Sequence, residues 1–246
     1  MCFIQSSHQF NIIFPLINVK MEAEAKMQTY LHQINPDNRK QYKLLQILLS
    51  IALSLFIIFV AVKITLLFKP LYYFDIKYLS IESQSGYSKA EIIKNYDYVI
   101  NYLLIPKSQE FQLPSIPYSN HGQIHFKDVK RIFTAIDILL ILSGLVSIIG
   151  SYLNIRNGSF NFLKKASSML ILLPTVLLTA FALNFNTAFV IFHKIFFRNN
   201  YWQFDPEIDP IINILPQQFF LHSALSIVFL IILSIVGLRL LYKKLA

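Results

Sequence analysis

The chain has 246 residues, of which 55% are hydrophobic, 15% aromatic and only 14% charged, and its mean hydropathy is +0.51. About a quarter of the residues of an ordinary soluble domain carry charge, so this composition excludes that class of protein. The net charge of +9 is scattered beside apolar segments instead of being gathered on one soluble face. This pattern indicates attraction to anionic lipid and gives no reason to expect a nucleic-acid partner.

Residues 1–43 are expected to form a cytoplasmic extension. Their one apolar run, FNIIFPLIN, is too short to cross a bilayer and lacks the charged region that precedes the apolar core of a signal peptide. The extension holds the only cysteine, Cys2, which excludes a disulfide framework and a cysteine-based metal site. Cys2 follows no apolar signal segment, so the chain is not expected to be a processed lipoprotein itself. The functional protein is expected to start at Met21 or Met27.

The apolar stretches that follow predict four transmembrane helices, at residues 44–68, 132–155, 166–192 and 216–240. Each stretch is long enough to cross about 30 Å of hydrocarbon as a helix that rises about 1.5 Å per residue. The second stretch carries an ionisable residue, Asp137, in its first turns. The predicted fold class is an α-helical integral membrane protein, with four transmembrane helices and a small α+β extracellular domain between the first two.

The distribution of charge predicts how these helices are oriented. The extension carries five Lys or Arg residues, and the loop at 156–165 and the tail at 241–246 carry basic residues without any acid. Basic residues next to transmembrane helices mark the cytoplasmic face of a membrane. Both termini are therefore expected in the cytoplasm, and residues 69–131 and 193–215 on the extracellular side of the cell membrane.

Residues 69–131 are expected to fold as the small α+β domain. The run Tyr72–Ile81 mixes alternating apolar and polar positions with residues of high β-propensity, which predicts a strand. Ser88 and Glu91 then stand at the spacing of a capping box, and apolar residues at helical spacing predict an amphipathic helix that ends at Pro106. One or two further short strands are expected after it. About sixty residues make a small core, so the domain should rest on the membrane, with this helix along the surface.

Two of the six histidines are the candidate catalytic residues. His125 lies just before the second transmembrane helix, in HFKDVKRIF, and His193 lies one residue beyond the third, so both are expected at the same outer boundary of the membrane. An imidazole is the side chain best suited to pass protons near neutral pH. Asp128 could accept a hydrogen bond from the His125 imidazole or cap the helix. His222 is expected to be a paired polar residue inside the bundle, and a proton-relay role is less favoured.

The extracellular loop at 193–215 is rich in aromatic residues. Such residues commonly form an interfacial belt, yet a belt does not explain a histidine in its middle. The second interpretation is that they bind the lipid part of a substrate. No G-x-S-x-G elbow, phosphate-binding loop, H-E-x-x-H motif or cysteine cluster occurs, so those reaction types have no motif here. The candidates for substrate binding are Phe192, Phe196, Phe197, Tyr201 and Trp202.

Three stretches of the sequence resemble the lipoprotein intramolecular transacylases of Gram-positive bacteria, the Lit family. They are HFKDVKRIF before the second transmembrane helix, FHKIFFRNNYWQFDPEIDPIINILPQQFF entering the fourth, and SGYSKAEIIKNYDYVINYL in the extracellular domain. The resemblance covers roughly residues 44–244, including the layout of four helices. It implies a diacylated lipoprotein substrate, whose N-terminal cysteine carries a diacylglyceryl thioether and a free α-amine. It also implies a transfer of the sn-2 acyl chain onto that amine, which gives the lyso form.

The residues themselves are compatible with such a reaction. An acyl-enzyme needs an activated cysteine or serine, whereas Cys2 lies on the wrong side of the membrane and no outer serine stands in a nucleophile motif. In an intramolecular transfer the substrate's own amine attacks, so the protein supplies positioning, proton transfer and stabilisation of an oxyanion, with no cofactor and no metal.

The two histidines are expected to divide the proton transfers between them. His193 is favoured as the base, because its aromatic surroundings disfavour the charged imidazolium. His125 would polarise the ester or protonate the leaving oxygen, with Asp128 orienting it. The sequence equally allows the two histidines to exchange roles.

Two other functions stay open on the sequence alone. The nearest enzymatic rival is an outer-leaflet lipid hydrolase, in which the histidines would activate water. A non-enzymatic lipid-binding membrane scaffold would need the aromatic residues but would tolerate His125→Ala. A small transporter is a poor fit, because the predicted helices hold few ionisable residues and no internal repeat is visible.

Overall fold

The computed structural model describes residues 36–107 and 109–246, and its regular elements are helices. Most of the expected extension, including Cys2, Met21 and Met27, lies outside the described residues. The helices are α2 (Pro36–Leu67), α3 (Lys69–Tyr78), α4 (Ile81–Ser85), α5 (Lys89–Leu104), α6 (Asn120–Arg156), α7 (Asn161–Phe196), α8 (Ile211–Ile214) and α9 (Gln217–Leu245).

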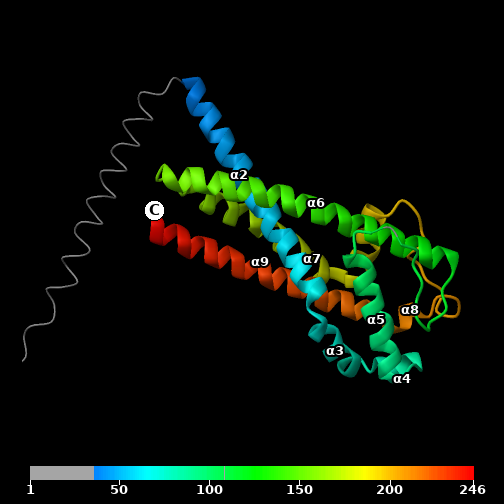
Figure 1. Cartoon of the computed structure of the whole chain (residues 1–246). Coiled ribbons are helices and arrows are strands. Elements are labelled where there is room, and N and C mark those ends of the chain that lie inside the picture. The colour runs from blue at the N-terminus through cyan, green and yellow to red at the C-terminus, as the bar shows by residue number, and fades with distance from the viewer. Residues whose placement is uncertain (1–35, 108) are drawn as a thin grey trace, which may run out of the picture.

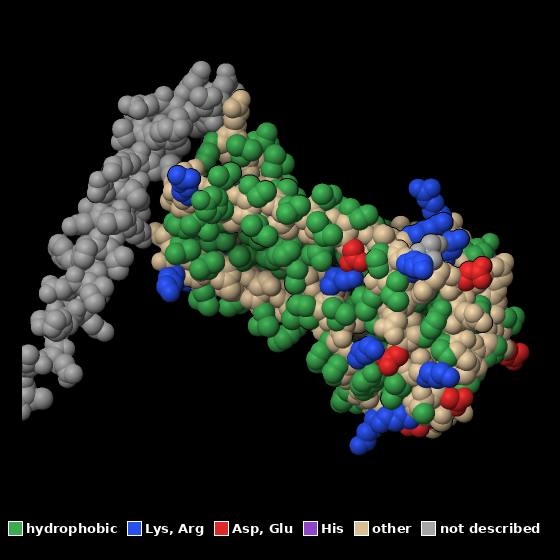
Figure 2. Space-filling model, in the orientation of Figure 1, with side chains coloured by type: hydrophobic (Ala, Val, Ile, Leu, Met, Phe, Trp, Pro, Cys, Tyr) green, Lys and Arg blue, Asp and Glu red, His purple; other side chains and the backbone are tan. Residues whose placement is uncertain are grey.

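Four of these helices, α2, α6, α7 and α9, are long and apolar enough to cross a membrane, which confirms the predicted number of transmembrane helices. Figure 1 shows them in one bundle, with α3, α4, α5 and α8 gathered at the end away from the C-terminus. In this bundle α2 packs against the other three long helices, and α7 packs along α9. Hydrophobic side chains cover the outside of the bundle, as contact with lipid requires, and most charged side chains lie over its ends (Figure 2).

The ionisable residue expected in the second transmembrane helix, Asp137, has a partner of opposite charge. Its carboxylate lies 2.7 Å from Nζ of Lys63 on α2. A charge at membrane depth is tolerated when an opposite charge neutralises it. The ion pair therefore explains how α2 and α6 can each carry a charge inside an otherwise apolar stretch, and it ties the two helices together.

The strand predicted over Tyr72–Ile81 is wrong. These residues form α3 and the start of α4, and the described residues contain no strand, so the part of the protein outside the bundle is helical and not α+β. Pro70 stands in the first turn of α3, where its missing N–H is not needed. The helix then places Tyr72, Asp75 and Ile76 on one buried face. Burial of this face overrides the β-propensity of the aromatic residues.

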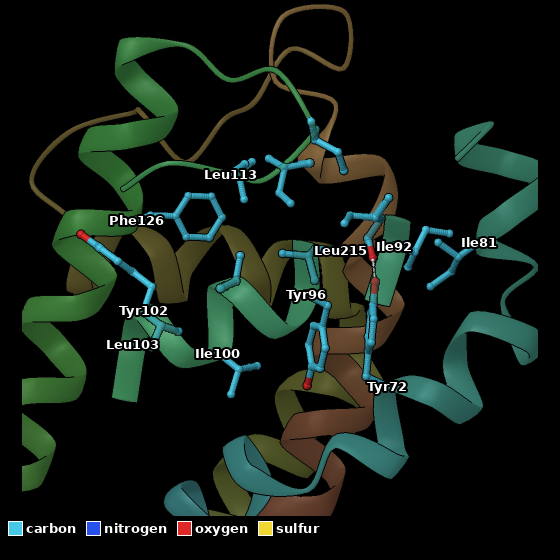
Figure 3. Packing of buried hydrophobic residues seen from close by; sticks show 14 of the residues in the cluster. Tyr72, Ile81, Ile92, Tyr96, Ile100, Tyr102, Leu103, Leu113, Phe126 and Leu215 are labelled. Atoms are coloured by element: carbon cyan, nitrogen blue, oxygen red, sulfur yellow. Dashed lines mark hydrogen bonds between the residues drawn. The ribbon is translucent and has the colours of Figure 1, made fainter. Parts of the chain in front are cut away.

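The amphipathic helix predicted from Ser88 is confirmed as α5. The Ser88 hydroxyl accepts a hydrogen bond from the backbone N–H of Glu91, and the Glu91 carboxylate accepts one from the backbone N–H of Ser88, as the capping-box spacing indicated. The helix ends at Leu104, just before Pro106. Its apolar face is buried in a core with residues of α3, α4, α6 and α8 (Figure 3), so this face packs against protein.

The N-terminal end of α6 is anchored by Asp209. One carboxylate oxygen of Asp209 accepts from the backbone N–H of Ser119 at 2.7 Å, and the other accepts from the Ser119 hydroxyl, also at 2.7 Å. The Ser119 hydroxyl in turn caps α6 by accepting from the N–H of Gly122 at 3.0 Å. A Cβ at position 122 would lie 2.5 Å from the Asp209 carboxylate, so a larger residue there would push that carboxylate out of its place. This anchor fixes the first turns of α6, which carry His125.

A kink at Asn184 divides α7. The backbone of Asn184 leaves the helical conformation, with φ −170° and ψ 106°. Its side-chain oxygen accepts from the backbone N–H of Thr187 at 2.9 Å, as the side chain of an N-cap residue does. The part of α7 after the kink is therefore a helical segment with its own cap, and it carries His193 in its last turn.

Candidate active site

A cavity of about 210 Å³ lies where the bundle of four long helices meets the shorter helices α5 and α8. Its walls come from α2, α5, α6, α7, α9 and residues 202–215, and most of its lining side chains are apolar. Among the described residues, no group of three or more His, Cys, Asp or Glu side chains could hold a metal ion. The lining side chains with polar atoms are Thr65, Tyr96, His125, His193, Trp202 and Ser223.

The two candidate catalytic residues line this one cavity, although they come from different helices. His125 and His193 are 7% and 8% exposed, and their ring centroids are 6.1 Å apart. Two imidazoles at this separation can contact the same small group between them. The structure thus brings together the two histidines that the sequence placed beside separate transmembrane helices.

The tautomer of neutral His193 follows from its surroundings. Its Nδ1 lies 2.8 Å from the backbone carbonyl oxygen of Phe189, and a carbonyl can only accept, so Nδ1 carries the proton. Nε2 is then left with a lone pair, and it has no hydrogen-bond partner among the described residues. The ring lies against Trp202, with centroids 4.6 Å apart, and against Phe197, with centroids 5.5 Å apart. His193 is therefore a fixed ring that presents one basic nitrogen.

The His125 ring also has aromatic neighbours. Phe197 and Phe204 lie with centroids 4.8 and 5.3 Å from it. Nδ1 of His125 is buried and has no hydrogen-bond partner within residues 36–107 and 109–246. A buried polar atom without a partner is uncommon and is expected to be satisfied by water or by a bound molecule.

The contact predicted between Asp128 and His125 is wrong. The Asp128 carboxylate accepts instead from Arg131, at 3.0 Å, and from the side-chain amide of Asn199, at 3.0 Å. It does not cap α6 either, since Ser119 does so. The other two donors occupy Asp128 because Arg131 stands one turn further along α6 and Asn199 lies in the loop after α7. Asp128 thus ties α6 to the loop that follows His193.

The five aromatic candidates lie in four different surroundings. Trp202 lines the cavity beside His193, and its indole Nε1 is buried with no partner among the described residues. Phe197 is buried against both histidine rings. Tyr201 stacks on His121, with centroids 4.1 Å apart. The remaining two, Phe192 and Phe196, are about half exposed and pack on each other on the outside of α7. Only Trp202 of the five lines the cavity itself.

The expectation that His222 is a paired residue is confirmed. Its Nδ1 lies 2.7 Å from the carboxylate of Asp75, which is completely buried on α3. Burial raises the pKa of the Asp75 carboxyl, and the hydrogen bond with His222 opposes that rise. The pair links α3 to α9 and lies outside the cavity lining.

Sequence reasoning missed Tyr96, Thr65 and Ser223 as cavity residues. Tyr96 was counted only as one of the apolar positions of α5, and the two smaller residues lie in apolar helices where a single hydroxyl is common. The available signal was weak: Tyr96 is a side chain with a polar end on a buried face that is mostly aliphatic. Nothing in the spacing of these three residues predicts that they share one cavity.

The chain was compared with known protein families and with solved structures. A family model described as lipoprotein intramolecular transacylase Lit matches residues 47–220 of the chain. A search of curated proteins returned no match.

Solved structures of the membrane integral lipoprotein intramolecular transacylase Lit from Bacillus cereus are similar over most of their length. One is 35% identical with a TM-score of 0.80, and the match covers 82% of this chain and 94% of that chain. A structure of that relative with a histidine-to-arginine mutation is 32% identical, with a TM-score of 0.77 over 90% of this chain and 96% of that chain. A third, with a histidine-to-alanine mutation, is 34% identical, with a TM-score of 0.77 over 85% and 94%.

Proposed function

Because the chain belongs to the lipoprotein intramolecular transacylase family, Lit, it is a membrane-integral acyltransferase that modifies lipoproteins, and we propose the transfer that it performs. The sn-2 acyl chain of a diacylglyceryl-cysteine lipoprotein moves from its glycerol oxygen to the α-amine of the same cysteine. The product is the lyso form, with one acyl chain on nitrogen and one on glycerol. The observation that carries this proposal is the pair of buried histidines in one apolar cavity.

The side of the membrane follows from charge. The basic loop at 156–165 and the C-terminus lie at the end of the bundle away from α5 and α8, which line the cavity (Figure 1). Basic residues beside transmembrane helices favour the cytoplasm. The cavity then opens at the extracellular boundary, and both termini lie in the cytoplasm. The substrate is a lipoprotein anchored in the outer leaflet.

His193 acts as the base in the first half of the reaction. The α-amine of the cysteine attacks the carbonyl carbon of the sn-2 ester, and the new C–N bond pushes an electron pair onto the carbonyl oxygen. The nitrogen loses its proton to Nε2 of His193, which is the one free acceptor of that ring. Because Nδ1 is held by the Phe189 carbonyl, the ring keeps this orientation as it becomes charged.

The second half of the reaction releases the glycerol oxygen. The carbonyl re-forms, the bond from the carbonyl carbon to the glycerol oxygen breaks, and that oxygen receives from the His193 imidazolium the proton that the amine had lost. His125 donates a hydrogen bond to the departing oxygen from the facing wall of the cavity. An ester and an amine become an amide and a hydroxyl, so the atoms balance without water or any co-reactant.

The arrangement of hydroxyls in the cavity favours direct attack over an acyl-enzyme. A nucleophilic serine or threonine needs a base within hydrogen-bonding distance. Thr65 lies 3.5 Å from Ser226, and among the described residues neither Thr65 nor Ser223 is hydrogen-bonded to a histidine. The substrate amine is the nucleophile that fits this cavity.

The test uses the fact that the proposed reaction is an isomerisation. The purified protein in detergent is mixed with a synthetic diacylglyceryl-cysteine lipopeptide, and the products are analysed by mass spectrometry before and after treatment with an amine-reactive reagent. The expected product has an unchanged mass and an amine that no longer reacts. Fragmentation should place one acyl chain on the N-terminal nitrogen.

Each alternative function gives a different product in the same assay. A lipid hydrolase would yield a lighter lipopeptide with a free amine and a released fatty acid. A non-enzymatic lipid-binding scaffold would leave the lipopeptide unchanged in mass and in amine reactivity. Either outcome would overturn the proposed transfer.

A further inference from the structure

Two tyrosines of the hydrophobic core around α5 form a stacked pair, and their hydroxyls lie at opposite ends of that pair. The rings of Tyr72 on α3 and Tyr96 on α5 are 3.7 Å apart between centroids, with an angle of 16° between planes. Figure 3 shows the Tyr72 hydroxyl directed to the backbone carbonyl of Ile214 and the Tyr96 hydroxyl directed the other way. Tyr72 donates to that carbonyl at 2.6 Å. The two rings therefore pack against each other, but their hydroxyl oxygens have different surroundings.

The Tyr96 hydroxyl has no hydrogen-bond partner among the described residues, although the side chain is only 3% exposed. Tyr96 lines the same cavity as His125 and His193. The oxygen is not among the fully buried side-chain atoms that lack a partner, so it keeps some accessible surface, and the side chain lines the cavity. A donor that is reachable from the cavity and is not engaged by the described residues can bind an acceptor that arrives with the ligand.

The position and the protonation of Tyr96 suit a hydrogen-bond donor. Phe219 lies edge-on to its ring, with centroids 6.0 Å apart, and Tyr72 covers one face, so the ring is held. Burial raises the pKa of Tyr96, so the phenol stays protonated at neutral pH. The ring of Tyr96 is thus held in place, and its hydroxyl keeps its proton at neutral pH.

The proposed acyl transfer needs such a donor, because attack on an ester places a negative charge on the carbonyl oxygen. Enzymes stabilise that oxygen with preorganised N–H or O–H groups. The free nitrogen of His193 is an acceptor, and the indole N–H of Trp202 has no surface that a group in the cavity could reach, so neither can donate to that oxygen. We propose that the Tyr96 hydroxyl donates a hydrogen bond to the carbonyl oxygen of the sn-2 ester and to the oxyanion formed during attack. This inference rests on the proposed function.

No proton is transferred from Tyr96 in this step. The amine proton goes to His193, the electron pair of the carbonyl goes to its oxygen, and the Tyr96 O–H stays intact while it stabilises that oxygen. When the intermediate collapses, the electron pair returns to the carbonyl. Tyr96 is therefore a catalytic residue that touches the reacting oxygen, and its contribution is to the rate of the chemical step and not to binding of the acyl chains.

The experiment compares two substitutions that each remove one oxygen from the same stacked pair. Tyr96→Phe and Tyr72→Phe are assayed with the diacylglyceryl-cysteine lipopeptide in detergent, and kcat and KM are measured by the appearance of N-acylated product. Tyr96→Phe is expected to lower kcat by about 10²- to 10³-fold with KM within a few-fold of wild type. Tyr72→Phe should leave kcat within a few-fold and lower the temperature of unfolding, since it removes a buried hydrogen bond outside the cavity.

A second variant guards against misfolding. Site-specific replacement of Tyr96 by 3-fluorotyrosine keeps the ring and the O–H donor, and is expected to keep kcat within a few-fold. If Tyr96→Phe retains wild-type kcat, or loses rate only through KM, the assignment to the oxyanion is overturned. Loss of activity in the fluorotyrosine variant with an intact fold would overturn it as well. Failure of wild-type protein to form the N-acylated product would instead refute the proposed function itself.

Discussion

At the scale of single residues, His193 has one ring nitrogen fixed by a carbonyl and the other free, so its chemistry is confined to one atom. We expect His193→Ala to slow acyl transfer by about 10²- to 10⁴-fold, the usual contribution of a proton-transfer group. His125→Ala should slow it by about 10²- to 10³-fold, the usual cost of removing one hydrogen-bond donor to a reacting oxygen. The measurement is the single-turnover rate with the lipopeptide. His121→Ala is the control, because His121 stacks on Tyr201 outside the cavity lining. Near-normal rates in both cavity variants would contradict the mechanism.

The pairing of His222 with Asp75 predicts a pH-dependent loss of stability. An unfolded Asp has a pKa of about 3.9, whereas burial raises the pKa of folded Asp75, so ionising this carboxyl opposes folding as pH rises through the folded value. His222 offsets that cost. His222→Ala should therefore lower the free energy of unfolding by about 1–3 kcal/mol at neutral pH and by less at acidic pH, where protonation of Asp75 removes the charge that His222 offsets.

Thermal unfolding midpoints in detergent at the two pH values would check this expectation. The rate of acyl transfer per folded molecule should change little, because the pair lies outside the cavity lining. An equal loss of stability at both pH values would show that the pair does not work through the charge on Asp75.

At the scale of elements, the start of α6 depends on a glycine. A Cβ at Gly122 would lie 2.5 Å from the Asp209 carboxylate that anchors the helix, whereas a Cβ at Gly237 in α9 would meet nothing within 4 Å. Gly122→Ala is expected to destabilise the protein by about 1–3 kcal/mol and to slow acyl transfer, because α6 carries His125. Gly237→Ala should be neutral or slightly stabilising, since alanine favours helix. Thermal unfolding of the two matched variants decides the point, and equal midpoints would contradict the anchor.

The elements were predictable where the signal was long, and unpredictable where it was short. The four transmembrane helices follow from apolar stretches of about twenty residues, and α5 follows from its cap and its periodic apolar face. The ten residues from Tyr72 to Ile81 were misassigned because aromatic residues favour strands locally. Only the packing of Tyr72, Asp75 and Ile76 against other helices reveals the helix. The secondary-structure propensity of a short segment does not depend on which of its side chains become buried against other helices.

The same limit applies to the site. His125 and His193 stand out because a polar side chain beside a long apolar segment is conspicuous in a sequence. Asp128 also stood out, but its partners, Arg131 and Asn199, could be told only from coordinates. Tyr96 is one of 13 tyrosines, and the sequence holds no sign that its hydroxyl lacks a partner in the described structure while that of Tyr72 has one.

At the scale of the whole molecule, orientation in the membrane is the prediction that decides where the substrate must be. Single cysteines are introduced in a Cys2→Ser background at Gln84, Asn200 and Asn157, which are exposed positions at the two ends of the bundle. A membrane-impermeant thiol reagent added to intact cells should label the first two positions and not Asn157. Labelling at Asn157 alone would reverse the orientation and move the cavity to the cytoplasmic side.

The cavity extends from Tyr96 in the outer helices to Val62 on α2 and Ile227 on α9, and both of these helices are apolar enough to span the bilayer. An acyl chain can therefore reach the histidines while its tail stays among hydrocarbon. Pulling a chain of fifteen methylenes into water would cost roughly 12 kcal/mol at about 0.8 kcal/mol per methylene. An isomerisation without a coupled energy source cannot supply that work, so enzyme and substrate meet by diffusion within the plane of the leaflet. Turnover should then follow surface dilution kinetics: at a fixed bulk concentration of lipopeptide, adding detergent should lower the rate in proportion to the mole fraction of substrate in the micelles.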